Sequence, residues 1–318
     1  MDISFIIVNW NTRDLLRDCL DSIDQTVDAL SYEIIVVDNA STDGSLDMLS
    51  QKYPRVKTIA NSENRGFGAA NNQGFAVMQG KYALLINTDA VLTKGAVQKL
   101  WDFAEANPRA AIVCGQLLNA DGSKQNSVAA FPTLLTLASN TSLLEYFFPG
   151  KYPSKRYDHQ RPLEVDSAIG ACMMIRKKAL DEVSFFDERY FFFFEETDLA
   201  FAMKRVGWKV YQVPDALIYH LQGQSIGHNT QSRIEFYRSR YQFLRKWHGG
   251  AYYRAASAVI FLRLLINILL AAAGVVFTLG MAKGLRRKLD VYIQILRWAM
   301  SNERRATSNE RRVTSDEQ

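Results

Sequence analysis

The chain opens with two short runs rich in β-branched apolar residues, at positions 3–8 and 34–37. Such runs are typical of strands that are buried on both faces of a sheet. Between them, apolar residues recur at the spacing of one helix face: Leu15, Leu16, Cys19, Leu20 and Ile23. The pattern predicts strand, helix and strand, and hence a parallel pair joined by a right-handed crossover.

The same alternation continues along the first third of the chain. Residues 56–78 predict a short strand, a glycine-containing loop and a helix, and "KYALLINTDA" at 81–90 predicts a third buried strand, followed by a helix at 95–106. In open α/β sheets, ligands bind outside the carboxyl ends of the strands. Four polar side chains are expected to gather along that edge: Asn9, Asp38, Asn64 and Asp89.

The order of elements changes after about residue 110. Strands are expected at 110–119 and 167–176, and the connection at 131–161 is too irregular to assign. A helix is then expected from about Glu196 to Val206, with a stop at Gly207 and a further strand. The fold class is therefore α/β, with a Rossmann-like, mostly parallel sheet flanked by helices.

Three regions follow from these patterns. Residues 1–230 form a domain with a first half at about 1–110 and a second half at about 111–230. Residues 231–300 are helical, basic and apolar. Residues 301–318 contain the polar repeat "NERRATS" and "NERRVTS", which has no apolar face, so we expect a disordered tail.

Basic charge is concentrated in one of these regions. Residues 231–300 hold twelve Lys and Arg against two acids, a net charge of +10, whereas residues 1–230 hold 22 basic and 27 acidic residues, a net charge of −5. Because long aliphatic runs are mixed with this charge and no nucleic-acid-reading motif is present, we expect a membrane surface and no nucleic acid as the partner.

The region 231–300 also contains an uncharged stretch of nineteen residues, 264–282, about 28 Å long as a helix. Basic residues flank it on both sides, so the stretch could span a bilayer or lie on it, and no orientation is preferred. The next helix places five apolar residues on one face, which favours a position in the membrane interface: Leu285, Leu289, Tyr292, Leu296 and Met300.

The compartment is inferred from the cysteines and the N-terminal residues. Cys19, Cys114 and Cys172 lie far apart without Cys-x-x-Cys spacing, so neither a disulfide framework nor a cysteine zinc site is indicated. The first apolar run is too short for a secretory signal and carries an acid where a signal carries basic residues. We therefore expect a protein of the cytoplasmic face of the membrane, peripheral or monotopic.

Several short motifs carry candidate chemistry, each with a structural alternative. "VVDNASTDGS" places Asp38 where its carboxylate could accept from the imide N–H of a pyrimidine base, although the same residues suit a capped helix start. "NRGFGAANNQG" fits neither G-x-G-x-x-G nor the P-loop pattern, so dinucleotide and P-loop chemistry are poorly supported. "INTDA" ends a strand in Asp89, which could bind a divalent cation or cap the strand.

Taken in order, the motifs resemble one family. The series "IIVNWN", "VVDNAS", "NRGFGAANN", "NTDA", "GACMMIR", "FDERYFFFFEETDL" and "HLQGQS" resembles the family 2 inverting glycosyltransferases with the GT-A fold, especially the bacterial rhamnosyltransferases of cell-wall and O-antigen assembly. The resemblance covers roughly residues 1–245. It implies a nucleoside-diphosphate sugar donor and a divalent metal, Mg²⁺ or Mn²⁺.

The resemblance also implies roles for particular residues. Asn87 replaces the first acid of the family's Asp-x-Asp, which leaves Asp89 as the expected metal ligand, with His220 either completing the site or packing at a strand end. Apart from the resemblance, Arg238 and Arg240 in "YRSRYQFLRKWHG" are expected either to bind a diphosphate on the donor or on a lipid acceptor, or to form a basic face toward anionic lipid head groups. The nucleotide-sugar-binding residues are expected to be Asn9, Asn11, Asp38, Ser41, Asn64, Gly66, Phe67, Asn71 and Asn87.

The stretch "FFFFEETD" sets four phenylalanines beside three acids. In the family, one acid of this motif deprotonates the acceptor hydroxyl, and its position falls on Glu196, with Glu195 as the alternative and Asp198 in support. A carboxylate whose pKa is raised by an aromatic wall suits that task. The alternative is that all three acids cap the positive end of the helix that they begin.

The implied activity is that of a hexosyltransferase. The expected reaction moves L-rhamnose from dTDP-rhamnose, with inversion, to a glycan carried on a polyprenyl diphosphate. Alternatives are a UDP-sugar donor, such as UDP-galactofuranose or UDP-N-acetylglucosamine, or a catalytically silent GT-A domain that binds a sugar or a partner.

Overall fold

The computed structural model describes residues 1–221 and 230–316, with side chains as far as Ser301. The chain divides into two compact units. Unit 1 comprises Met1–Phe131 and Thr141–Gly227, and unit 2 comprises Pro132–Asn140 and His228–Gln318. The short segment 132–140 therefore belongs with the C-terminal helices, although it is embedded in the sequence of unit 1.

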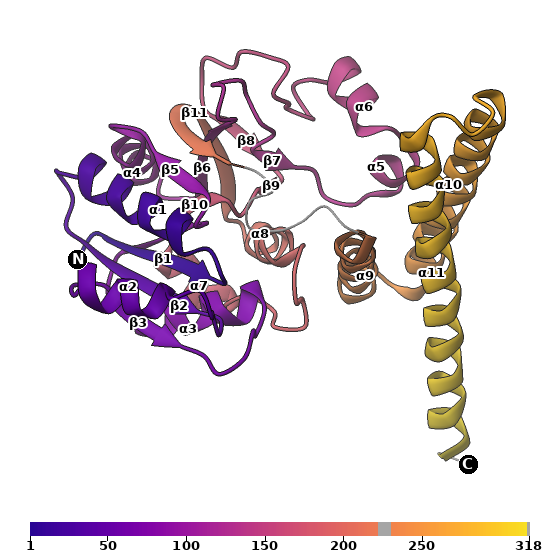
Figure 1. Cartoon of the computed structure of the whole chain (residues 1–318), viewed down its shortest axis with the longest axis horizontal. Helices are drawn as coiled ribbons and strands as arrows, with labels where there is room; N and C mark the ends of the chain where they lie inside the picture. Colours follow the sequence, from indigo (N-terminus) through magenta and orange to yellow (C-terminus); the bar gives the residue numbers. More distant parts are fainter. Residues whose placement is uncertain (222–229, 317–318) are drawn as a thin grey trace. The chain divides into compact units, whose positions relative to one another are not determined.

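Unit 1 is built on a nine-stranded sheet with the order β3-β2-β1-β4-β10-β6-β11-β5, in which β8 also pairs with β11 (Figure 1). The strands of this sheet are β1 (Ile3–Asn9), β2 (Tyr32–Asp38), β3 (Lys57–Ala60), β4 (Tyr82–Ile86), β5 (Ala90–Leu92), β6 (Ala110–Leu118), β8 (Leu163–Val165), β10 (Cys172–Arg176) and β11 (Lys209–His220). Two further strands, β7 (Val128–Ala129) and β9 (Ser167–Ala168), pair with each other.

The predicted strand, helix and strand at the N-terminus is confirmed. Strand β1 pairs in parallel with β2 and with β4, and β2 pairs in parallel with β3. Strand β10 is antiparallel to both β4 and β6, so it reverses the direction in the middle of the sheet. The mixed α/β fold with a mostly parallel first half therefore agrees with the sequence pattern.

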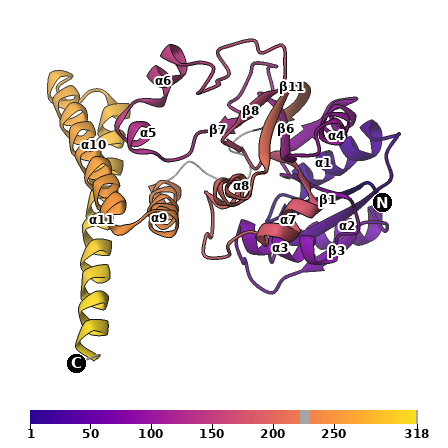
Figure 2. The ribbon, with the colours of Figure 1, turned by 180° about the vertical axis from the view of Figure 1, so that it is seen from behind.

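Helices cover both faces of the sheet (Figures 1 and 2). They are α1 (Arg13–Thr26), α2 (Ser45–Lys52), α3 (Phe67–Val77), α4 (Ala96–Ala106), α7 (Lys177–Val183) and α8 (Glu195–Arg205); unit 1 also contains the short helix α6 (Thr141–Phe147), which lies off these faces. Along β1, Phe5 and Ile7 belong to one hydrophobic core with α1, and Ile6 belongs to a second core with α3 and α8. Successive side chains point to opposite faces, so apolar runs without polar alternation follow from burial on both sides.

Unit 2 is helical. It consists of α5 (Leu134–Ala138), α9 (Thr230–Trp247), α10 (Gly250–Phe277) and α11 (Lys283–Asp316). Its small core is formed by Leu137, Leu244, Ala256 and Ile260. The guanidinium of Arg263 donates to the carbonyl of Leu137 at 2.7 Å, which ties α5 to α10.

Helix α5 lies in the connection that the sequence pattern does not assign. Thr133 and Thr136 form a reciprocal capping box at its start, in which each side chain accepts from the other residue's backbone N–H. With only five residues, α5 is too short for a helical period to appear in the sequence.

At the other end of the chain, the backbone of α11 is helical to Asp316, which differs from the tail expected at 301–318. Each copy of the repeat there contains one Glu and two Arg, which have high helix propensity. The side chains of 302–318 lie outside the described residues, so the solution behaviour of the tail stays a prediction.

Among the described residues, α10 alone is long and apolar enough to cross a membrane by length and composition. Only 17% of its most apolar window is buried within the protein. A core helix of a soluble protein would be mostly buried, so the surface of α10 needs a separate explanation, which is taken up below.

Candidate active site

The carboxyl ends of β1 and β2 are joined by a pair of buried polar side chains. Asn9 and Asp38 are in register on neighbouring strands, and neither has exposed surface. The amide Nδ2 of Asn9 donates to Oδ2 of Asp38 at 2.7 Å, and the backbone N–H of Ser41 donates to Oδ1 at 2.8 Å. Because Asp38 is enclosed in this way, direct contact with a base requires the segment after β2 to move.

The loops after these two strands are cross-linked at the surface. The backbone N–H of Asn11 donates to Oγ of Ser41 at 2.9 Å, and the backbone N–H of Thr42 donates to Oδ1 of Asn11 at 2.7 Å. Asn11 has a φ of +54°, a conformation that Asn tolerates better than most residues. Beside it, the indole of Trp10 is 51% exposed, which the motif analysis overlooks. This loop pair therefore offers an aromatic face and amide groups at the sheet edge.

The asparagines near the glycine motif bind protein groups. Asn64 Oδ1 accepts from the N–H of Gly66 at 2.9 Å and from Nδ2 of the buried Asn39 at 3.2 Å. The buried Asn71 donates to the carbonyl of Phe67 at 2.9 Å. These contacts shape the loop before α3. In this structure the side chains of Asn64 and Asn71 therefore hold the loop in place, and any effect of theirs on a ligand is exerted through the position of that loop.

The position of Gly66 in "NRGFGAANNQG" cannot hold a side chain. Its φ is +83°, and a Cβ at this position would lie 2.5 Å from the carbonyl oxygen of Phe191. The N–H of Phe67 donates to the same carbonyl at 3.2 Å. The glycine motif therefore joins the first half of unit 1 to the segment that carries the candidate base, without serving as a phosphate loop.

The aromatic run before α8 has a strained backbone. Phe193 and Phe194 have φ values of +68° and +72°, in the left-handed region that bulky residues rarely adopt. Phe194 is buried and directly precedes α8, whereas Phe191 is 51% exposed. Such strain persists only where the surrounding structure holds it, and it concentrates at functional sites.

The three acids at the start of α8 differ in their surroundings. Asp198 is buried and accepts a hydrogen bond from the hydroxyl of Tyr190 at 3.1 Å. Glu195 is 1% exposed, and its side chain lies against Gly68. Glu196 is half-buried, so it is the only one of the three with appreciable exposed surface.

Burial raises the pKa of Glu196 to about 7. Its carboxyl carbon lies 4.0 Å from the position of a Cβ built on Gly170, and the ring of Phe67 lies beside the same glycine at 3.7 Å. A carboxylate that is partly exposed and titrates near neutral pH can take a proton from a substrate. These properties favour Glu196 over Glu195 for that task.

The residue after Gly170 connects Glu196 to the "NTDA" motif. The carbonyl of Ala171 accepts from the backbone N–H of Asn87 at 2.9 Å. The turn at Gly170–Ala171 therefore lies near Glu196 and is hydrogen-bonded to the segment that leads to Asp89. Two motifs more than 100 residues apart in sequence meet at this turn.

Asp89 and His220 lie together at the ends of neighbouring strands. The residue Ala90 pairs with His220, and the carbonyl of Asp89 accepts from the N–H of Leu221 at 2.8 Å. Oδ1 of Asp89 is 3.4 Å from Nε2 of His220, and both residues are buried. The sequence-based pairing of these two residues is thus reproduced in the geometry.

Gln125, which the sequence does not single out, holds the other side of His220. Its Nε2 donates to the backbone carbonyls of His220 at 2.5 Å and Leu118 at 3.4 Å. The amide oxygen must then be the atom 3.0 Å from Nδ1 of His220, so Nδ1 carries a proton. In the neutral ring, Nε2 consequently presents a lone pair toward Asp89.

A carboxylate oxygen and an imidazole lone pair 3.4 Å apart suit a divalent cation. Within residues 1–221 and 230–301, the structure contains no group of three or more His, Cys, Asp or Glu side chains that could hold a metal. Two protein ligands still fit a metal whose other positions are filled by diphosphate oxygens and water. Asn87, half-buried in the same motif, contributes no carboxylate.

Arg238 and Arg240 lie on α9 in unit 2. Arg238 forms an ion pair with Glu235 one turn away, and the guanidinium of Arg240 lies over the rings of Phe236 at 4.6 Å and Tyr237 at 5.2 Å. Both arginine side chains therefore contact partners on their own helix, α9. A role toward a diphosphate or lipid head group stays a prediction.

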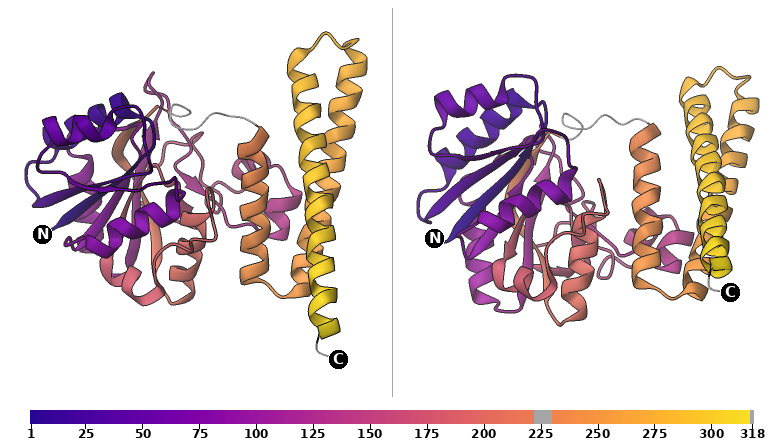
Figure 3. Two further views of the ribbon diagram at one scale, coloured as in Figure 1. Left: turned by 60° about the horizontal axis from the view of Figure 1, so that its bottom comes forward. Right: turned by 90° about the horizontal axis from the view of Figure 1, so that it is seen from below.

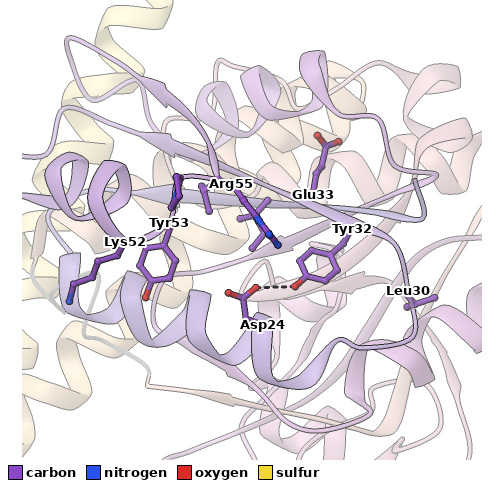
Figure 4. Close-up of a pocket in the computed structure, with 10 residues that line it drawn as sticks. Asp24, Leu30, Tyr32, Glu33, Lys52, Tyr53 and Arg55 are labelled. Atoms are coloured by element: carbon purple, nitrogen blue, oxygen red, sulfur yellow. Dashed lines mark hydrogen bonds between the residues drawn. The ribbon is translucent and has the colours of Figure 1, made fainter.

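A cavity of about 650 Å³ lies at the opposite end of the sheet, at the amino ends of β2 and β3 (Figure 4). Both of its tyrosines are paired with acids: Tyr32 donates to Asp24 at 2.9 Å, and Tyr53 donates to Asp21 at 2.7 Å. Because ligands of such sheets bind at the carboxyl ends of the strands, this cavity is not the candidate site.

Comparison with known proteins identifies the family of the chain. A family model described as Glycosyl transferase family 2 matches residues 4–184. The N-acetylglucosaminyl-diphospho-decaprenol L-rhamnosyltransferase of Mycobacterium tuberculosis is 30% identical to this chain over 233 residues, which are 68% of this chain and 76% of the relative. The Poly(ribitol-phosphate) beta-glucosyltransferase of Bacillus spizizenii is 37% identical over 127 residues, 38% of this chain and 20% of that protein.

Among solved structures, a crystal structure of GalNAc-T7 with UDP, GalNAc and Mn²⁺ is similar to this chain with a TM-score of 0.55 and 15% identity. The match covers 75% of this chain and 47% of that one, about half of its length. At this identity the likeness shows the fold alone, which is the GT-A fold expected from the motifs. Since the family model covers more than half of the residues, the chain belongs to glycosyl transferase family 2 and is a glycosyltransferase.

Proposed function

We propose that this glycosyltransferase moves L-rhamnose from dTDP-rhamnose, with inversion, to a glycan carried on a polyprenyl diphosphate. The observation that carries the proposal is the turn at Gly170–Ala171, which lies near the half-buried Glu196 and is hydrogen-bonded to the segment leading to Asp89. A base and a diphosphate-binding group on either side of one turn suit a displacement at the sugar carbon between them.

In this mechanism, Glu196 takes the proton from the acceptor hydroxyl as that oxygen attacks the anomeric carbon. The bond to the nucleoside diphosphate breaks on the opposite face, so a single displacement inverts the configuration. Asp198, held by Tyr190, and the buried Glu195 support the start of α8. Because burial raises the pKa of Glu196, its carboxylate is a stronger base than an exposed one.

Asp89 and His220 would hold a divalent cation, Mg²⁺ or Mn²⁺. When bound, the cation would neutralise the charge that develops on the departing diphosphate. Asn87 stands where a second acid would add a ligand, so the protein's contribution to metal affinity rests on Asp89 and His220.

The rhamnose donor is supported by the relative from M. tuberculosis, whose name specifies an L-rhamnosyltransferase acting on a decaprenol-linked acceptor. A UDP-sugar is the second candidate. The relative from B. spizizenii, 37% identical over 127 residues, is named for the transfer of another sugar, glucose, so a donor other than dTDP-rhamnose is kept as the alternative. Thymine and uracil present the same imide edge, so Asp38 does not separate dTDP from UDP.

The polyprenyl acceptor places the enzyme at a membrane, and we infer the cytoplasmic face, where nucleotide sugars are made. The apolar helix α10 and the net charge of +10 in residues 231–300 support membrane association. The acceptor sugar is taken to be N-acetylglucosamine by analogy with the relative's name.

The test is transfer by the purified full chain, with dTDP-rhamnose, UDP-galactofuranose and UDP-N-acetylglucosamine offered separately, with Mg²⁺ or Mn²⁺ and a polyprenyl-diphosphate N-acetylglucosamine. Turnover with dTDP-rhamnose, lost in Glu196→Gln while donor binding persists, is the expected result. Glu195→Gln serves as the matched control for the neighbouring acid. Binding of a donor without turnover under every condition would instead indicate a silent GT-A domain.

A further inference from the structure

Helices α10 and α11 form an antiparallel hairpin within unit 2 (Figure 3). They are joined by the five residues 278–282, and near this tip a Cβ built on Gly274 would lie 2.9 Å from Leu285. At the other end, the rings of Trp298 on α11 and Tyr241 on α9 are 6.3 Å apart. Since the two helices pack along each other, α11 returns to the end from which α10 starts.

The exposed surface of this hairpin is apolar at its tip. Val276, Phe277, Leu279 and Met281 are each exposed by 73% or more. Along α10 the exposed apolar surface continues through Leu262, Ile266, Leu269 and Leu270. A patch of this extent is unfavourable in water and marks a surface that something else covers.

A collar of basic side chains follows the tip directly. Lys283, Arg286, Arg287 and Lys288 are exposed on the first two turns of α11, and Asp290 is the one acid in residues 231–300 apart from Glu235. An apolar tip with a basic collar is complementary to an anionic lipid surface, where acyl chains lie beneath negatively charged head groups. A second copy of the chain would bring a like-charged collar against this one, so self-association is disfavoured.

The charges on α11 favour shallow insertion of the hairpin over a membrane span by α10. If α10 crossed a bilayer, α11, packed along it, would carry five charged side chains into the hydrocarbon: Arg286, Arg287, Lys288, Asp290 and Arg297. Such placement is strongly unfavourable. The apolar face expected to lie on the membrane, from Leu285 to Leu296, is half-buried, which leaves the tip and α10 as the exposed apolar surface.

We propose that the α10–α11 hairpin is a monotopic anchor that enters an anionic membrane from one face. The tip lies at the boundary of the acyl chains, the collar contacts the head groups, and both ends of the hairpin stay on the same side. This inference deepens the membrane location under the proposed function, and it does not depend on which sugar is transferred.

Vesicle binding tests the lipid partner. The full chain is sedimented with vesicles of phosphatidylcholine, with or without phosphatidylglycerol. The variant Arg286→Gln/Arg287→Gln/Lys288→Gln is expected to bind the anionic vesicles roughly 100-fold more weakly. Each basic residue near an anionic surface adds a similar amount to the binding free energy, so the effects of the three substitutions on the binding constant multiply. Lys52→Gln/Arg55→Gln/Lys57→Gln, which removes the same charge from exposed positions of unit 1, should bind as the wild type does. Equal loss in both variants would overturn the assignment to the hairpin.

Single cysteines test the topology, because the native Cys19, Cys114 and Cys172 are buried. Leu279→Cys at the tip should react with a membrane-impermeant maleimide in lipid-free protein, and from neither side in spheroplasts or inverted vesicles. Ala251→Cys and Ser301→Cys should react from the cytoplasmic side only. Labelling of Leu279→Cys from the periplasmic side would show a span, and protection without lipid at high protein concentration would show self-association. Donor hydrolysis is measured in the same preparations. An active protein with either of these two labelling results would overturn the monotopic anchor without affecting the proposed function.

A second inference concerns Gln125 and rests on a separate observation. Its amide contacts His220 twice, through the backbone carbonyl at 2.5 Å and through Nδ1 at 3.0 Å, and it is buried. These contacts fix both the ring orientation and the tautomer. Outer partners of this kind orient histidine ligands and raise their basicity.

We infer that Gln125 is a positioning residue, which keeps the Nε2 lone pair of His220 directed at the site shared with Asp89. Gln125→Leu removes both hydrogen bonds with little change in volume. The matched control is Gln212→Leu, since Gln212 is a buried glutamine on the same strand as His220 but donates to Gln116 instead.

Mn²⁺ is the probe, with its affinity measured by electron paramagnetic resonance in the presence of UDP or dTDP, and its nitrogen ligation by electron spin echo. Gln125→Leu should lower Mn²⁺ affinity by about 10- to 100-fold and weaken the nitrogen signal. Gln212→Leu should keep both, even if it is less stable to denaturant. An unchanged affinity and nitrogen signal in folded Gln125→Leu, or no nitrogen signal in the wild type, would overturn the inference.

Discussion

The two ends of the central sheet differ in an instructive way. The amino ends of β2 and β3 border a cavity of about 650 Å³, whereas the carboxyl ends hold the Asn9–Asp38 pair, Asp89, His220 and, through the turn at Gly170–Ala171, Glu196. The cavity's two tyrosines donate to acids, Tyr32 to Asp24 and Tyr53 to Asp21, while the carboxyl edge has a carboxylate with a raised pKa and an imidazole nitrogen 3.4 Å from an acid. Hollow volume and chemical function therefore lie at opposite ends.

The largest expected effect is on kcat, and it distinguishes a carboxylate at the carboxyl end of the sheet, Glu196, from one at the amino end, Glu33. Glu196→Gln should lower kcat by roughly 10²- to 10⁴-fold, because general-base catalysis is lost. Glu33→Gln at the amino end keeps an acceptor for Ser4 and the N–H of Gln79, so its kcat should match the wild type. Steady-state transfer assays on both variants make the comparison, which fails if Glu33→Gln is equally impaired.

A similar pair of variants tests metal dependence. Asp89→Asn should lower Mn²⁺-supported turnover by roughly 100-fold, since a bound cation contributes several kcal/mol to charge stabilisation. Asp24→Asn in the cavity should leave the metal titration unchanged, although its bond to Tyr32 is altered. Activity is titrated against Mn²⁺ for each protein, and a normal titration curve for Asp89→Asn would remove it from the proposed site.

The pH dependence should reflect the carboxyl edge alone. Burial raises the pKa of Glu196 to about 7, so its base form is lost as the pH falls below that value. We expect kcat/KM to decline about tenfold per pH unit below 7 and to level off above it. A flat profile between pH 5 and 8 in the wild type would contradict Glu196 as the base.

The same shift has the opposite consequence for stability. The folded pKa lies above the unfolded one, so the protonated form is favoured in the fold, and this contribution is fully present below about pH 4.5 and is lost as the pH rises through 7. Denaturant unfolding at several pH values should show that Glu196→Gln lacks this decline.

The smallest expected effect concerns two glycines without room for a side chain. Gly66→Ala meets the carbonyl of Phe191 and must adopt a φ of +83°, so it should lose at least about 1–2 kcal/mol of unfolding free energy. Gly80→Ala at the amino end meets the N–H of Ser4 and should also be destabilised. Only Gly66→Ala should change the KM for the donor as well, and equal KM values in the two variants would show that the loop before α3 does not contact the donor.

Much of this architecture can be predicted from the sequence. The runs at β1, β2 and β4 are apolar on both faces because helices cover both sides, so their strand character and parallel order follow directly. Asn9, Asp38 and Asp89 follow from the rule that ligands bind at strand carboxyl ends. The family motifs then identify Glu195 and Glu196 as candidate bases.

Other features depend on contacts that a linear pattern does not contain. Gln125 lies in an irregular segment, and only the fold brings it to His220. Exposure separates Glu196 from Glu195, two identical side chains that are neighbours in sequence. The apolar face of α11 predicts a membrane surface equally well as a partner helix, and α10 is that partner.

The backbone at Phe193 and Phe194 has a consequence for how such an enzyme can change over generations. Two consecutive aromatic residues in left-handed conformations store backbone strain, and glycine at the half-buried Phe193 would relax the chain, whereas glycine at the buried Phe194 would leave a cavity. Selection for robustness alone would relax that strain. A lineage released from the need to transfer sugars would therefore be expected to lose the phenylalanine at position 193 first, before Asp89.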